Sequence, residues 1–200
     1  MARTGRPRSF DEETIVDRAR EKFWERGYAA TSIRTLADDL GVLPGSLHAA
    51  FGSKRVLFLR SLQDFAEMSH SSVQSLATSD APLDAVRGLL ESVLEAAHEA
   101  PGRGCMLGNT AIEMLPQDEE ARMIVHSGLQ SFEHGIENGL RAAQQAGEVR
   151  KDIDCRSQAR LLVTLVQGLH VNARAERTPE KLYDVIDVAL GAIRESEPTS

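Results

Sequence analysis

Basic side chains are the clearest chemical feature of this sequence, and they concentrate near its beginning. Residues 1–60 hold 11 Lys or Arg and 8 Asp or Glu, whereas residues 61–200 hold 12 and 22. The formal net charge of the whole chain is −7, which taken alone argues against binding to nucleic acid. The uneven distribution fits either a basic working end on an acidic body or an ordinary uneven surface.

The sequence lacks the patterns of enzymes and metal sites. It contains no Gly-rich phosphate loop, no Gly-x-Ser-x-Gly and no Cys-x-x-Cys. Its histidines lack the spacing of metal ligands; they are His48, His70, His98, His126, His134 and His170. We therefore expect no enzymatic activity, no metal and no cofactor.

Composition indicates a soluble helical protein. Hydrophobic residues make up 42% and charged residues 26% of the chain, as in globular proteins. Apolar runs of period two are almost absent, so an all-α fold of about nine helices is expected. No apolar stretch approaches about 18 residues, so no membrane span is expected. Two cysteines, Cys105 and Cys155, are too few for a disulfide scaffold and indicate reduced thiols in a cytoplasm.

The positioning elements can be read from caps and periodicity. Ser9 and Asp11 are both plausible N-caps of the first helix, and Ser9 with Glu12 fits a capping box. The first three helices are expected from Ser9 to Gly27, from Thr31 or Ser32 to Gly41, and from Pro44 to Ala50. Ser53 would cap a fourth, reaching about Ala77; five more are expected near residues 83–100, 105–115, 118–146, 156–177 and 179–194. We place the boundary between a head and a body at 1–53 and 54–200.

Three short helices with a Gly-containing turn predict a helix-turn-helix unit, which presents its last helix to the DNA major groove. Gly45 would let that helix approach the bases closely, because glycine has no side chain. Leu47 and Phe51 are expected to face the head core. The outward residues, and thus the expected contacts to bases or DNA backbone, are Pro44, Gly45, Ser46, His48 and Ala49.

Phosphate contacts are expected at two helix starts. Thr31, Ser32 and Arg34 begin the second helix, where hydroxyls and free N–H groups suit a phosphate. Lys54 and Arg55 begin the fourth, where cations oppose the helix dipole; a phosphate opposite them would explain this, and solvated surface residues are the alternative.

An arginine-rich arm precedes the first helix. Arg3, Arg6 and Arg8 surround Gly5 and Pro7, as in arms that enter an A·T-rich minor groove. The alternative is a basic tail that attracts DNA without regard to sequence.

The segment of about residues 10–60 resembles the TetR family of bacterial regulators. The residues that match its pattern are Phe23, Gly27, Tyr28, Thr31, Ala37, Gly41, Val42, Gly45, Leu47, Phe51, Ser53 and Lys54. The resemblance implies a repressor that binds a palindromic DNA operator as a homodimer and is released by a small-molecule effector. Three residues depart from the pattern. The family usually has Ser or Thr in place of Leu43, Tyr in place of His48, and often an acidic residue in place of Arg55. The departure at His48 puts its expected DNA contact in doubt.

The resemblance implies that the last two helices pair with a second subunit. Their apolar residues, expected in the interface, are Leu162, Leu165, Val166, Leu169, Val185, Ile186 and Ala189. The alternative is that both faces are buried within one subunit.

The resemblance also implies an effector cavity in the body. Apolar residues that would line it are Phe65, Met68, Leu94, Met106, Met123 and Phe132, unless they are plain core. Cys105 follows Arg103 and a Gly-rich break at a helix start, where dipole and arginine would favour a thiolate. The segment resembles the cysteine element of electrophile-sensing members of the family, so Cys105 and the neighbouring Arg103 are expected effector contacts. The alternative for Cys105 is a buried structural cysteine.

Two other functions remain open from the sequence. One is a non-specific architectural DNA-binding protein, against which the acidic body argues because it would repel the duplex. The other is a regulator without a ligand, and activation is as compatible with the residues as repression.

Overall fold

The computed structural model describes residues 11–100, 102–176 and 180–195, and in these ranges the chain is all helical. The nine described α-helices are α1 Glu12–Arg26, α2 Ile33–Leu40, α3 Pro44–Phe51, α4 Lys54–Ser71, α5 Pro82–Glu99, α6 Met106–Met114, α7 Glu119–Gln145, α8 Cys155–Ala175 and α9 Glu180–Gly191. A 3₁₀ turn covers Leu76–Thr78, and an isolated bridge joins Val149 to Arg194. The predicted fold class is confirmed.

Local sequence explains where the head helices begin. Asp11, rather than Ser9, caps α1, since its carboxylate accepts a hydrogen bond of 2.8 Å from Thr14 N; Ser9 lies outside the described residues. Ser32 caps α2 in the same way, accepting from Thr35 N at 3.0 Å. Gly41 ends α2 in the left-handed conformation, at φ 71°, which glycine adopts without strain.

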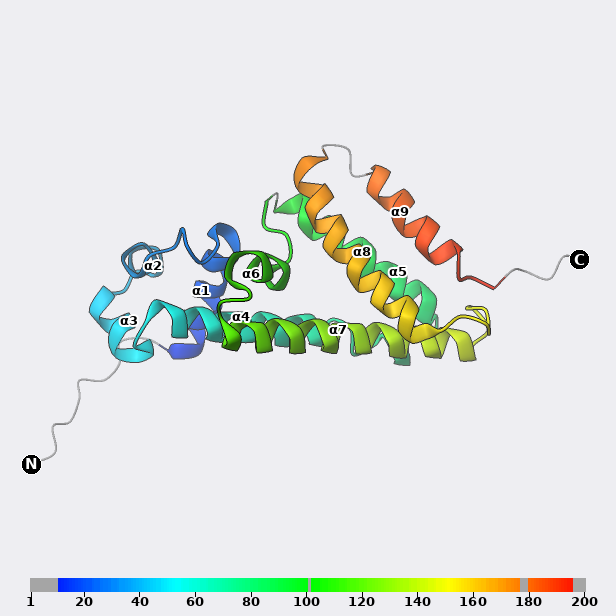
Figure 1. Ribbon diagram of the computed structural model, residues 1–200, viewed down its shortest axis with the longest axis horizontal. Coiled ribbons are helices and arrows are strands. Elements are labelled where there is room, and N and C mark those ends of the chain that lie inside the picture. The colour runs from blue at the N-terminus through cyan, green and yellow to red at the C-terminus, as the bar shows by residue number, and fades with distance from the viewer. Residues whose placement is uncertain (1–10, 101, 177–179, 196–200) are drawn as a thin grey trace, which may run out of the picture.

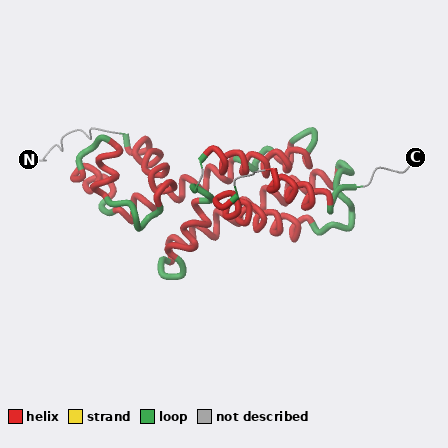
Figure 2. Tube along the Cα trace, turned by 90° about the horizontal axis from the view of Figure 1, so that it is seen from above, coloured by secondary structure: helices red, strands yellow, loops and turns green. Residues whose placement is uncertain are grey.

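A long pair of helices forms the spine of the molecule. Figure 1 shows α4 and α7 lying side by side, with α1–α3 at one end and α5, α8 and α9 at the other. The view from above separates the head from the body helices in the same way (Figure 2). α4 ends at Ser71, earlier than the expected Ala77, and the 3₁₀ turn follows it.

Small residues let α7 approach its neighbours closely. A Cβ atom at Gly128 would lie 2.9 Å from Leu107 Cδ1, and one at Gly135 would overlap the side chain of Val73. At Gly139 the nearest atom would be Leu76 Cβ, at 2.9 Å. These glycines therefore hold α7 against α4, α6 and the 3₁₀ turn.

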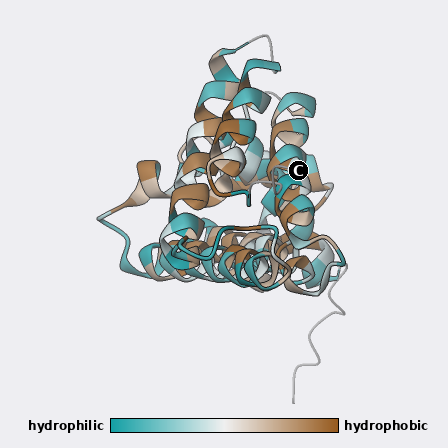
Figure 3. Cartoon of the chain, turned by 90° about the vertical axis from the view of Figure 1, so that its right-hand side faces the viewer, coloured by the Kyte–Doolittle hydropathy of each residue, from teal (hydrophilic) through white to brown (hydrophobic). Residues whose placement is uncertain are grey.

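Two apolar clusters form the core, and the first crosses the expected boundary at residue 53. It joins α1, α2 and α3 to α4, and continues through Met106, Leu107 and Met114 of α6 to Ala121 and Val125 of α7. The second fills the body between α5, α7, α8 and α9. Seen end-on in Figure 3, the helices carry hydrophobic and hydrophilic residues side by side, as amphipathic helices do. No helix in the described ranges has the length and apolar character needed to cross a membrane.

Candidate nucleic-acid interface and body cavity

α3 presents one face outward and buries the other. Leu47 and Phe51 are 1% and 5% exposed and pack into the head cluster, as expected. The outward residues are Pro44, Gly45, His48 and Ala49, which are exposed, and Ser46, which is half-buried. The N-cap Leu43 makes no side-chain cap and is 74% exposed. An apolar side chain at this position could contact a thymine methyl group, a role that the sequence pattern did not suggest.

At the start of α2, Arg34 is available for the expected phosphate contact and Thr31 is not. The exposed Arg34 has no hydrogen-bond or ion-pair partner within the described ranges. Ser32 is exposed beside it, although its Oγ is already the cap of α2. Thr31 is fully buried and its hydroxyl donates to Gly27 O at 2.7 Å, so the expected phosphate contact at Thr31 is wrong.

Both cations at the start of α4 have partners inside the chain. Lys54 Nζ donates to Tyr28 O at 3.0 Å and lies 4.0 Å from the centre of the Tyr28 ring. Arg55 forms a two-pronged pair with Asp118 at 2.7 and 2.8 Å and reaches Glu120 at 2.9 Å. The carboxylates of α7 therefore supply the anions that were expected from DNA, and a phosphate is not needed to explain Arg55. The other basic residues expected at DNA, Arg3, Arg6 and Arg8, lie outside the described residues.

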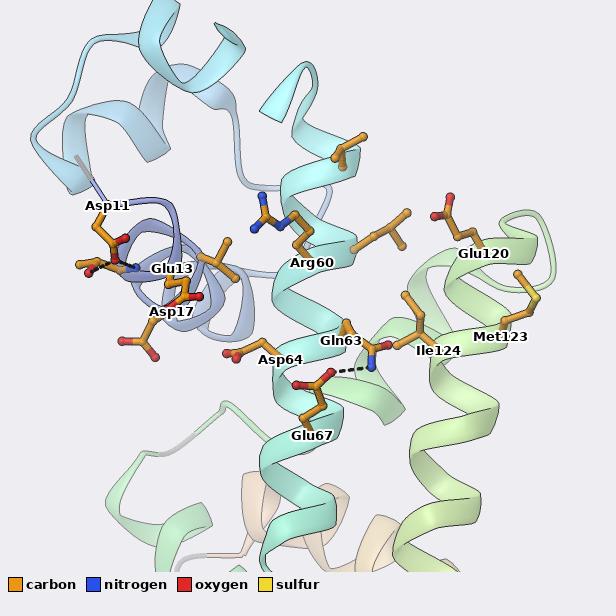
Figure 4. A pocket seen from close by; sticks show the side chains of 14 residues that line it. Asp11, Glu13, Asp17, Arg60, Gln63, Asp64, Glu67, Glu120, Met123 and Ile124 are labelled. Atoms are coloured by element: carbon orange, nitrogen blue, oxygen red, sulfur yellow. Dashed lines mark hydrogen bonds between the residues drawn. The ribbon is translucent and has the colours of Figure 1, made fainter. Parts of the chain in front are cut away.

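A wide depression of the head surface is lined by carboxylates. It is an open groove of about 940 Å³ between α1, α4 and α7. Figure 4 shows the carboxylates that face it: Asp11, Glu13, Asp17, Asp64, Glu67 and Glu120. Such a surface would repel a phosphate backbone, so α2 and α3 are the better candidates for contacts to DNA.

Met123 lies in this groove, at 54% exposure, and not in the body cavity where it was expected.

A second cavity, of about 250 Å³, lies where the head meets the body. Four expected residues line it: Phe65, Met68, Cys105 and Phe132. Leu94 and Met106 are each 2% exposed and belong to the two core clusters, so they do not line it. Arg103 is also corrected, because its guanidinium pairs with Glu21 at 2.7 Å and covers the Trp24 ring at 4.8 Å.

Several lining residues escaped the sequence analysis. They are Trp24 of the head, Ser69, Ser72 and Ser92, and Gln167 and His170 of α8. A signal for His170 existed, since it follows the buried Val166 by one helical turn and so shares its face. Trp24 had none, because nothing in the sequence shows that α1 reaches the body.

His170 is a half-buried histidine whose Nδ1 atom is nearly inaccessible to solvent. Its Nδ1 atom has no hydrogen-bond partner within the described part of the chain. Burial, and to a lesser extent the nearby Arg174, lowers the pKa of His170 to about 4. The ring is therefore neutral at pH 7, and the side chain would have to turn to present Nδ1 to the cavity.

The two cysteines differ in surroundings. Cys105 is half-buried at the N-cap of α6, faces the cavity and makes no capping hydrogen bond. Arg103 is engaged with Glu21, so one of the two expected influences on the Cys105 thiol is directed elsewhere. Cys155 is buried, and this burial raises the pKa of its thiol.

α6 connects the cavity to the head at both of its ends. Before its start, Gly104 O accepts a hydrogen bond from Trp24 Nε1 at 2.7 Å. Near its other end, the Glu113 carboxylate accepts from Tyr28 N at 2.9 Å and Ala29 N at 2.6 Å. A displacement of α6 would therefore reach the loop between α1 and α2 directly.

The expected pairing residues divide by burial. Leu162, Val166, Leu169 and Ile186 are between 0% and 3% exposed within one subunit, so they cannot meet a partner and need correction. Leu165 and Ala189 are half-buried and Val185 is 37% exposed. The most exposed apolar side chains of α8 and α9 are Leu161 at 54%, Val171 at 61% and Val188 at 73%.

Two family profiles match the chain. Residues 15–60 match the profile described as "Bacterial regulatory proteins, tetR family". Residues 82–189 match "Tetracyclin repressor-like, C-terminal domain".

Similar proteins cover nearly the whole chain. YezE of Bacillus subtilis, an uncharacterized helix-turn-helix (HTH)-type transcriptional regulator, is 29% identical over 94% of this chain and 99% of its own. The Escherichia coli HTH-type transcriptional repressor BdcR is 29% identical over 95% and 92%. A solved structure of the TetR family regulator CifR, a cysteine mutant with 26-bp operator DNA, is 29% identical, with a TM-score of 0.80 over 94% of this chain and 100% of that one.

Proposed function

The chain belongs to the tetR family of bacterial regulatory proteins, and we propose that it is a cytoplasmic repressor that binds a palindromic operator as a homodimer and is released by a small molecule. DNA-binding transcriptional regulation is the function of this family. The observation that carries the proposal is α3, whose apolar side is buried while Pro44, Gly45, His48 and Ala49 face outward. CifR, of similar fold, binds operator DNA.

We assign the DNA contacts to the surface of α2 and α3 and to the chain before α1. Ser32 and Arg34 would hold a phosphate, and Leu43 with the outward residues of α3 would meet base edges. Lys54 would reach the backbone only by leaving Tyr28 O, and Arg55 only by leaving Asp118. Arg3, Arg6 and Arg8 would follow the minor groove.

Pairing follows from the size of the recognition helix. One helix of eight residues reads only a few base pairs, so specificity requires two copies about 34–36 Å apart, or a multiple of that spacing. Leu161, Val171, Val185 and Val188 give α8 and α9 the exposed apolar side chains that a pairing surface needs, with Leu165 and Ala189 beside them.

Release is proposed to pass through α6 and α4. A ligand in the cavity would touch Trp24, Phe65 of α4 and the residues at the start of α6. Because Glu113 and Gly104 tie α6 to the head, a shift of α6 would turn the head relative to the body and change the spacing of the two recognition helices.

Cys105 is proposed to contact the effector, and to react with it when the effector is an electrophile. Its position on the cavity wall supports this assignment. Replacement by serine should then abolish the response to an electrophilic inducer such as methylglyoxal while leaving operator binding intact. Undiminished induction in Cys105→Ser would leave Cys105 a structural residue.

The test of the main proposal is selection of DNA fragments bound by the full chain, followed by competition with bulk DNA. We expect a palindromic site preferred by about 10³-fold or more at physiological salt. Equal binding to bulk DNA would indicate an architectural protein instead. A reporter behind the selected site should be silenced by the chain; activation would contradict repression, and silence that no compound lifts would indicate a regulator without a ligand.

A further inference from the structure

The wall of the body cavity combines apolar side chains with a few uncharged polar groups. It is built from aromatic and aliphatic side chains, with Trp24, Phe65 and Phe132 as the aromatic members. Hydroxyls of three serines, the Gln167 amide and the His170 ring supply its polar groups. No Asp, Glu, Lys or Arg of the described chain lines it.

The charged groups nearest to the cavity are already engaged. The Arg174 guanidinium donates to Arg103 O at 3.0 Å and to Asn109 Oδ1 at 2.9 Å. Arg103 covers the Trp24 ring, which would otherwise be the best platform for a cationic ligand. An ammonium group in the cavity would therefore lose its hydration without finding a carboxylate, and a carboxylate would gain a counter-charge only if Arg174 left its present acceptors.

Among the buried side-chain polar atoms of the described ranges, His170 Nδ1 is the one without a hydrogen-bond partner. A buried nitrogen without a partner is costly, so a ligand that satisfies Nδ1 gains affinity from that contact. A neutral imidazole has one donor and one acceptor nitrogen. A hydroxyl group serves either case, because it can both donate and accept.

We propose that the cavity binds a small, uncharged, mainly apolar alcohol or phenol, whose hydroxyl pairs with His170 Nδ1 once the imidazole ring turns toward the cavity. This rests on the proposed function, in which the same cavity receives the effector. A volume of about 250 Å³ is at or below the small end of ligand cavities, which begin near 300 Å³. The ligand is thus a compact molecule of one or two rings or a short branched chain.

The test uses three probes of one shape: 4-tert-butylcyclohexanol, tert-butylcyclohexane and 4-tert-butylcyclohexanecarboxylate. Trp24 is the only tryptophan of the sequence, and these probes do not absorb where it is excited, so its emission reports occupancy directly. At pH 7 we expect the alcohol to bind about five-fold more tightly than the hydrocarbon. We expect the carboxylate to bind at least about ten-fold more weakly than the alcohol.

Variants separate the hydroxyl contact from general apolar binding. His170→Leu should remove the advantage of the alcohol over the hydrocarbon while the hydrocarbon still binds. His126→Leu, at an exposed histidine of α7 outside the cavity wall, should leave the order of the probes unchanged. The comparison of probes in the unaltered chain needs no variant, so a folding defect in His170→Leu would not remove the test.

The inference is overturned by any of three results. These are a carboxylate that binds as well as the alcohol, an alcohol preference that survives in His170→Leu, and no change in Trp24 emission or melting temperature with any probe up to its solubility. Operator selection uses no probe, so it fails or succeeds separately. A chain that selects one DNA site but ignores the alcohol keeps the proposed function and loses only the ligand class.

Discussion

Arg55 and Asp118 join the first turn of α4 to the first turn of α7. Asp118 serves twice, since it also caps α7 by accepting from Ala121 N at 3.0 Å. The hydrogen bonds from Arg55, and then that from Ala121 N, lower the pKa of Asp118 from its ordinary 3.8 to about 2. The link therefore holds at neutral pH and depends on one carboxylate staying ionised.

Asp118→Asn should keep the cap and lose the charge. Because the folded pKa lies below the unfolded one, the carboxylate stabilises the fold above about pH 4, and this stabilisation disappears as pH falls toward 2. We expect Asp118→Asn to lower Tm by up to about 3 °C at pH 7, with the difference shrinking below pH 4. Calorimetry across pH checks this. Asp11→Asn, at the cap of α1, is the control, since only hydrogen bonds from Thr14 and the backbone lower its pKa, and an equal pH dependence there would contradict the role of Arg55.

Arg34 is the residue on which the electrostatics of DNA binding can be tested most cleanly, since it has no intramolecular partner within the described ranges. Arg34→Ala should weaken binding to every DNA sequence alike. It should also reduce the slope of log affinity against log salt by about one. Arg156→Ala, an exposed arginine at the start of α8, removes the same charge far from the head and should leave the slope unchanged. Equal effects of the two would mean that Arg34 acts only through net charge.

Single residues of the site were predictable where a short pattern sets their surroundings. The outward face of α3 follows from helical spacing between Leu47 and Phe51. Thr31 was not, because whether its hydroxyl turns to Gly27 O or to solvent depends on the packing of the loop. Trp24 and His170 meet at the cavity from opposite ends of the chain, and no local pattern records such a meeting.

Among the elements, α6 is the shortest body helix in the described chain and the one with the most direct hold on the head. Glu113→Ala removes the acceptor for two loop amides, so hydrogen exchange at Tyr28 N and Ala29 N should become about five-fold faster. Glu113→Gln keeps one carbonyl oxygen, so its exchange rates should lie between those of the unaltered chain and those of Glu113→Ala. Unchanged exchange in Glu113→Ala would show that the loop is held by other contacts.

The crossing of α7 with the segment after α4 depends on the absence of a side chain at Gly135. Gly135→Ala should lower the free energy of unfolding by about 1–3 kcal/mol, because the new methyl group meets Val73. In the double variant Gly135→Ala, Val73→Ala the loss of unfolding free energy should be smaller than the sum of the two single losses, by at least about 0.5 kcal/mol. Gly88→Ala, on the open side of α5, should instead stabilise by about 0.5–1 kcal/mol. Denaturant titration measures all four; full additivity would place the collision elsewhere.

The order and type of the elements were predictable, because caps and apolar spacing are local signals. Part of the expected pairing face proved to be buried within the subunit. α8 is apolar at Leu161, Leu162, Leu165, Val166 and Leu169, which covers more than one side of the helix, and periodicity alone cannot say which side meets the body core. Only the packing against α5, α7 and α9 decides it.

For the molecule as a whole, the pairing proposal gives a clear experiment. Val188→Glu places a charge on an apolar side chain that is 73% exposed, so the subunit should still fold. Light scattering should then show a monomer, and operator affinity should fall by at least about 100-fold as the second half-site contact is lost. Ile112→Glu, at 83% exposure on α6, is the matched control and should remain dimeric. A dimer that survives Val188→Glu would move the interface away from α9.

The shared core of the head also limits how this regulator can be recombined. Phe23, Leu36 and Leu47 pack in one cluster with Leu107 of α6 and Val125 of α7. An excised fragment 1–53 would lack the part of this cluster that α4, α6 and α7 supply. A chimera joined at residue 53 would pack the head against body residues of another protein. Exchange of DNA specificity between such proteins therefore succeeds by replacing the outward residues of α3, or by moving the head together with α4, α6 and the first turns of α7.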